Sequence, residues 1–167
     1  MTAMKKLQNG FFPAQGARPM PSDLVQSEER RCAISALMRA GYITPESVIS
    51  LRRLLLAETG IDRQEAEALL ALERAGFLTC PEWHEFLTEA IVEHMVWELR
   101  PSGVLNEEQA EWLVAQCDQA RTFTAFSILV TVLNEAHRVP RWFIPAVRGR
   151  AASGWPGVAE ARNAVAA

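Results

Sequence analysis

The stretch "RAGFLTCPEW" (residues 74–83) contains the end of one helix followed by the start of another. Gly76 is a stop signal, because glycine adopts the left-handed conformation that ends a helix at the lowest cost. Pro81 is favoured at the first position of a new helix. Thr79 and Glu82 have the spacing of a capping box, which satisfies the first backbone N–H groups of that helix. The stretch therefore predicts two helices joined by a tight turn.

The same combination of a helix-ending glycine and a helix-capping residue recurs along the chain. The upstream stretch "RAGYITPES" (residues 39–47) has a glycine, a capping Thr44 and a proline in the same order, with one residue fewer. The stretches "TGIDRQEAE" (59–67) and "SGVLNEEQAE" (102–111) are looser copies, each with a glycine before a capping pair. These turns are too short for a crossover, so consecutive helices are expected to pack as neighbours. The capping pairs of the looser copies are Asp62 with Glu65, and Asn106 with Gln109.

The intervals between these turns predict an all-α protein, a single bundle of about six helices in one domain. Nothing in the pattern requires a strand. Residues 1–22 and 140–167 are rich in Pro and Gly, with Gln at the first end and Ala at the second, so we expect them to be flexible arms on a helical domain of residues 23–139. The expected helices span residues 24–40, 45–57, 62–75, 81–99, 106–118 and 122–137.

The charge is divided unevenly along the chain. The net charge is −3, but residues 29–137 have nine Arg against seventeen Asp or Glu, whereas residues 138–167 have five Arg against one Glu. An acidic body repels phosphates, which disfavours a nucleic-acid partner. No apolar run approaches the length of a membrane span, and the first residues lack the apolar core of a signal peptide. We expect a cytoplasmic protein.

The glycine turns resemble the skeleton of a calcium-binding EF-hand, but they lack its ligands. With Gly60 as the sixth loop position, the ligand positions 1, 3, 5 and 12 hold no carboxylate, and the loop around Gly103 has a single one. The three cysteines form no CxxC pair, which argues against a zinc site. The residues at the four positions around Gly60 are Leu55, Ala57, Thr59 and Ala66.

Residues 49–133, with "LRRLLLAETGIDRQEAEALLALE", "FLTEAIVEHMVWELRPSGVLNEEQAEWL" and "FSILVTVL", resemble the tellurite-resistance TerB-like helical family. The resemblance implies a non-enzymatic module of interaction or stress response, with a divalent-metal-responsive protein as the alternative. In this family, acidic residues at helix starts follow Asp-Gly-x-Ile-type turns. Here Thr59 and Ser102 replace the aspartates. The acidic metal site that the resemblance implies would consist of Asp62, Glu65, Glu107 and Glu108.

The basic C-terminal segment interleaves arginine with aromatic residues, a composition that suits an acidic partner, an anionic membrane surface or RNA. We expect Trp142 and Phe143 to pack on the body and the chain beyond Gly149 to be mobile, because the aromatic pair follows an apolar helix closely. If this segment instead remains available, it is the candidate site for an unidentified protein partner. Its candidate residues are Arg138, Arg141, Trp142, Phe143, Arg148 and Arg150.

The remaining patterns favour no reaction. The motifs of phosphate-binding loops, dinucleotide sites and serine hydrolases do not occur, so we expect no enzyme and no cofactor, with a small hydrolase as a less favoured alternative. A DNA-binding helix-turn-helix over residues 32–56 is disfavoured by Glu46 at the start of its second helix. His94 lies on the apolar side of its helix, where we expect a satisfied core or rim histidine; the functional alternative is a ligand paired with Glu98, one turn on. Four glutamates form a stripe that is typical of a solvated helix face: Glu82, Glu85, Glu89 and Glu93.

Overall fold

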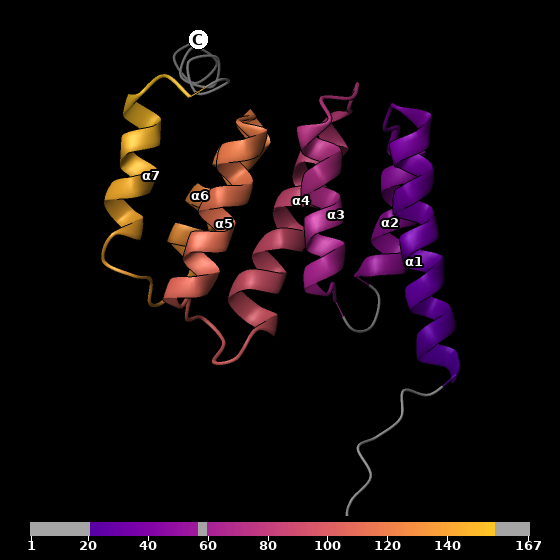
Figure 1. Cartoon of the computed structure of the whole chain (residues 1–167), viewed down its shortest axis with the longest axis horizontal. Helices are drawn as coiled ribbons and strands as arrows, with labels where there is room; N and C mark the ends of the chain where they lie inside the picture. Colours follow the sequence, from indigo (N-terminus) through magenta and orange to yellow (C-terminus); the bar gives the residue numbers. More distant parts are fainter. Residues whose placement is uncertain (1–20, 57–59, 156–167) are drawn as a thin grey trace, which may run out of the picture.

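The structure is a computed structural model that describes residues 21–56 and 60–155, with residues 21–24 as backbone only. Within these residues the chain forms seven α-helices and one π-helical segment, η1 (Figure 1). Their bounds are α1 Pro21–Ala40, α2 Pro45–Leu55, α3 Arg63–Arg74, α4 Pro81–Val92, η1 Glu93–Glu98, α5 Glu107–Ala120, α6 Phe123–Glu135 and α7 Phe143–Ala152.

The helices form two layers of neighbouring helices. Helices α1, α3 and α5 contact one another in sequence within one layer, and α2, α4 and α6 do so in the other. Contacts α1–α2, α3–α4 and α5–α6 join the layers, so the fold is a stack of three helical hairpins with α7 packed against α6 (Figure 1). Within this stack, α4 contacts helices of both layers.

The all-α prediction is confirmed, and the described part of the chain contains no strand. Two details differ. A seventh helix, α7, lies where the sequence predicted a flexible tail, and the expected helix 81–99 changes character after Val92. There the Leu99 N–H donates to the His94 carbonyl, five residues back, at 3.3 Å, which is the hydrogen bond of a π-helix.

The two similar turns, which contain Gly41 and Gly76, lie side by side. The Ile43 N–H donates to the Leu78 carbonyl at 2.9 Å, and Tyr42 and Leu78 form an isolated parallel bridge. The opposite end of the stack has a second bridge, in which the Leu105 N–H donates to the Arg138 carbonyl at 2.9 Å. Each bridge satisfies backbone groups of two different turns: the first joins the turns within the first two hairpins, and the second joins the connections before and after the third hairpin.

Three of the four expected caps are confirmed. Thr44, Asp62 and Asn106 each accept a hydrogen bond from the backbone N–H three residues on, and the last two form complete capping boxes. The expected cap at Thr79 is wrong, because the helix begins at Pro81 and its N-cap is Cys80, which makes no side-chain capping bond. The extra residue in this turn moves Thr79 one position too far from the helix.

The core is centred on α4. Half of this helix is buried against its neighbours, and its Trp83 indole N–H donates to the buried Glu73 carboxylate of α3 at 2.7 Å. A buried charge needs such a partner, because an unpaired one costs several kcal/mol. The buried residues of α4 are Trp83, Phe86, Leu87, Ala90, Ile91 and Val92.

The C-terminal segment folds back on α5 and α6. Phe143 is fully buried, as expected, and Trp142 is half-buried with its indole N–H donating to Glu107. The expected mobility beyond Gly149 is wrong for residues 150–155. Arg150 forms an ion pair with Asp118, and the buried Trp155 donates to the Thr122 carbonyl at 2.8 Å. The expected arm of residues 1–22 lies outside the described residues up to residue 20, as does the end of the expected tail, residues 156–167.

Among the helices of the described residues, none combines the length and the apolar character that crossing a membrane requires.

Substitution of the aromatic pair distinguishes a buried anchor from a rim contact. Phe143→Ala should lower the free energy of unfolding by about 3–5 kcal/mol, because it removes a fully buried ring, and Trp142→Ala should lower it by less. Urea denaturation measures both values. Arg148→Ala, on the exposed side of α7, is the control and should change stability by no more than about 0.5 kcal/mol. A larger loss for Trp142→Ala than for Phe143→Ala would contradict this packing.

Candidate functional site

A line of carboxylates runs along the exposed side of α4 and into η1. We call Glu85, Glu89 and Glu93 the acidic ridge; all three are exposed and follow one another at four-residue steps. Such residues lie on one face of a helix, so their carboxylates are neighbours. The stripe predicted from the sequence is thus present, and its surroundings decide what it can do.

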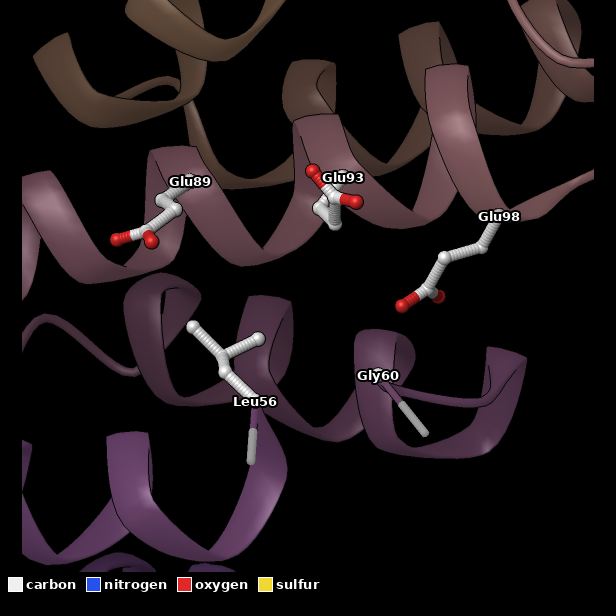
Figure 2. Close-up of a pocket in the computed structure, with 5 residues that line it drawn as sticks. All are labelled: Leu56, Gly60, Glu89, Glu93 and Glu98. Carbon is white, nitrogen blue, oxygen red and sulfur yellow. The ribbon is translucent and has the colours of Figure 1, made fainter. Parts of the chain in front are cut away.

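Two cavities adjoin the acidic ridge, one on each side. The first has a volume of about 290 Å³ and lies between η1 and the end of α2; Figure 2 shows its lining. The second has a volume of about 350 Å³ and lies between α4 and α6. Glu89 and Glu93 line both cavities, so the ridge separates two hollows that share its charge. The first cavity is lined by Leu56, Gly60, Glu89, Glu93 and Glu98; the second by His84, Glu85, Thr88, Glu89, Val92, Glu93, Thr131 and Glu135.

Only part of this negative charge is neutralised within the fold. Arg52 of α2 forms an ion pair with Glu89, and the Trp97 indole N–H donates to Glu135 at 2.9 Å. For Glu85 and Glu93, the described residues provide neither an ion pair nor a hydrogen-bond donor to the carboxylate. The ridge therefore presents two unneutralised carboxylates to solvent.

Glu98 closes one end of the first cavity. Its carboxylate reaches toward Gly60, so closely that a Cβ at Gly60, which has φ of 66°, would lie 1.2 Å from Glu98 Oε1 (Figure 2). Glu98 Oε2 lies 3.3 Å from Nδ1 of the buried His94. Burial raises the pKa of the Glu98 carboxyl, as does Glu93 nearby, whereas His94 opposes that rise. Glycine at position 60 is thus required for the approach of Glu98 to the turn.

The carboxylates proposed as metal ligands from the sequence are separated and engaged by the fold. Asp62 and Glu65 cap α3 reciprocally, at 2.8 and 2.9 Å, and Glu65 also lies 3.6 Å from Arg30. Glu107 accepts from Trp142, and Glu108 lies 3.5 Å from Arg63. Within residues 21–56 and 60–155, no three His, Cys, Asp or Glu side chains form a group that could hold a metal ion.

The six basic and aromatic residues proposed for partner binding divide into two groups. Arg150, Trp142 and Phe143 are occupied by contacts with the body. The other three are exposed, and the described chain provides no carboxylate in ion-pairing distance of them. These are Arg138, Arg141 and Arg148. Partner binding by this surface stays a prediction.

Sequence analysis missed the contacts between distant parts of the chain around the second cavity and around Trp112. Glu135 lies 38 residues from its partner Trp97, and the Trp112 indole N–H donates at 3.1 Å to Glu67, 45 residues away. No local spacing indicates such contacts, because they depend on how the hairpins stack. The pairing of His94 with Glu98 does follow from helical spacing.

Comparisons with known proteins give no match to this chain among protein-family models, curated proteins or solved structures.

Calcium should have no effect on thermal stability. Because the Asp62 and Glu65 carboxylates are engaged in the capping box, about 1 mM calcium, at the weak end of the range for EF-hand loops, should leave the melting temperature unchanged relative to EDTA. Asp62→Ala should lower stability by about 1 kcal/mol through loss of the cap, equally with and without calcium. A calcium-dependent rise in melting temperature, abolished in the double variant Asp62→Ala with Glu65→Ala, would establish the metal-responsive alternative.

Proposed function

We propose that this protein is a non-enzymatic helical interaction module that binds a basic segment of a protein partner on the acidic ridge. The observation that carries the proposal is the presence of two carboxylates without a basic partner, Glu85 and Glu93, at the edges of two adjoining cavities. Carboxylates clustered beside concave surface attract cationic groups and increase the rate of their association.

The spacing along the ridge favours a helical ligand. Consecutive carboxylates of the ridge are four residues apart, which corresponds to about 6 Å along a helix axis, and the ridge extends over about 12 Å. A partner helix with Lys or Arg at positions i, i+4 and i+8 has the same spacing. Apolar lining from Leu56 and Val92 offers contacts to the aliphatic stems of these side chains.

The resemblance of residues 49–133 to the TerB-like family supports a role in stress response, in which such a module would act through its partner. A cytoplasmic location remains part of this proposal and rests on the sequence. The metal-responsive alternative gains no support from the geometry, since the carboxylates on which it depends cap α3 or contact Trp142 and Arg63.

A peptide with the matching spacing tests the proposal. The probe is a fluorescent helical peptide with Lys or Arg at i, i+4 and i+8, and the reference peptide has the same composition with the basic residues distributed around the helix. The matched peptide should bind more tightly, and added salt should weaken its binding because exposed charges are screened. Fluorescence anisotropy measures both affinities.

Charge-matched variants locate the binding surface. The double variant Glu85→Gln with Glu93→Gln should weaken binding of the matched peptide about three- to tenfold, as expected for two exposed ion pairs. The control, Glu29→Gln with Glu111→Gln, removes the same charge from exposed positions on α1 and α5 and should have little effect. Equal weakening by both variants, or equal binding of both peptides, would refute a specific site on the ridge.

A further inference from the structure

His94 is a buried polar residue that the proposed function does not use. It is 6% exposed, and its Nδ1 pairs with Glu98 at 3.3 Å. The other ring nitrogen, Nε2, has no hydrogen-bond partner among the described residues. In the described chain, the Thr88 hydroxyl is the only fully buried side-chain polar atom without a hydrogen-bond partner, so the unpartnered Nε2 is not fully buried. Nε2 is therefore accessible from outside the protein.

His94 also lines a third cavity, between η1 and the start of α5. Its volume is about 150 Å³, which is the size of a cavity that can hold one benzene ring. Met95, Leu99 and Trp112 give it apolar surface, and its remaining lining residues are polar. These are Arg63, His94, Asn106, Glu108 and Gln109.

The capping box of α5 determines what its two amides can offer. Asn106 Oδ1 accepts from the Gln109 N–H at 2.8 Å, and Gln109 Oε1 accepts from the Asn106 N–H at 2.9 Å. Both amide oxygens accept within the capping box, and no hydrogen-bond acceptor of the described residues takes the amide nitrogens of these two cavity-lining residues, which remain donors. They suit an oxygen atom of a ligand.

The pairing with Glu98 determines what His94 can offer. An ionised Glu98 carboxylate can only accept, so a neutral His94 ring paired with it would carry its proton on Nδ1 and present a lone pair at Nε2. The His94–Glu98 pair would thus offer a hydrogen-bond acceptor beside a ring-sized space that has apolar surface from Met95, Leu99 and Trp112.

We infer that this cavity is a binding site for a small aromatic molecule that carries a hydroxyl group. The ring would pack on Met95, Leu99 and Trp112, the hydroxyl would donate to His94 Nε2, and its oxygen would accept from the amide nitrogens of Asn106 and Gln109. The site is separate from the acidic ridge: Glu98 lines the first cavity, but Glu85, Glu89 and Glu93 do not line this one.

Phenol and anisole form a matched pair of probes, because anisole has the same ring and oxygen but lacks the hydroxyl proton. The chain contains three histidines, His84, His94 and His137, whose ring Cε1–H signals can be followed by NMR and assigned with single His→Asn variants. Phenol should shift the His94 signal saturably and leave those of His84 and His137 unchanged. Anisole should bind about three- to tenfold more weakly, since one hydrogen bond is lost.

The comparison of the two probes uses the unaltered protein, so it does not depend on a variant that folds. As a second measurement, His94→Gln should weaken phenol binding by a similar factor in calorimetry, with His84→Asn as the control that retains wild-type affinity. Equal affinity for phenol and anisole, a phenol shift shared by all three histidines, or no shift of the His94 signal would each overturn the inference. None of these outcomes bears on the peptide binding proposed for the ridge.

Discussion

The burial of α4 is the constraint on which the rest of the structure depends. This helix contacts α2, α3 and α6, and half of its residues are buried, so its charged side chains have one narrow strip on which to remain solvated. The acidic ridge is the result. The same burial brings Trp83 against Glu73 and thereby joins the two layers by a hydrogen bond as well as by apolar contact.

The pairing of turns converts three hairpins into a stack. Each hairpin contacts mainly its neighbours, as in repeat proteins, so the spacing between hairpins must be fixed locally. The bridge of Tyr42 with Leu78 does this for the first two hairpins, and at the opposite ends of the helices the bridge of Val104 with Arg138 joins the connections on either side of the third. The cavities beside the ridge lie between neighbouring hairpins, one between η1 and the end of α2 and the other between α4 and α6.

The uneven charge of the chain has two different outcomes. In the C-terminal segment, Arg150 pairs with Asp118 and lies about 6.0 Å from the Trp155 ring, so part of the basic charge holds the segment on the acidic body. On α4, Arg52 neutralises Glu89, but Glu85 and Glu93 remain without a basic partner among the described residues. Opposite charge thus holds the C-terminal segment on the body at one place, whereas two carboxylates of α4 and η1 stay unpaired among the described residues.

The sequence by itself determined the helices, three of the four caps and the pairing of His94 with Glu98, because caps and i, i+4 contacts are local and follow from residue type and spacing. It misplaced the cap at Thr79 and missed α7, a short helix with Gly149 in its interior whose Phe143 and Val147 are buried against neighbouring helices. Only the tertiary structure decided which glutamates and aspartates are engaged within the fold and which remain unpaired beside a cavity. Asp62 and Glu65 cap a helix, whereas Glu85 and Glu93 border cavities, since the surroundings of each depend on residues of other hairpins brought together by packing.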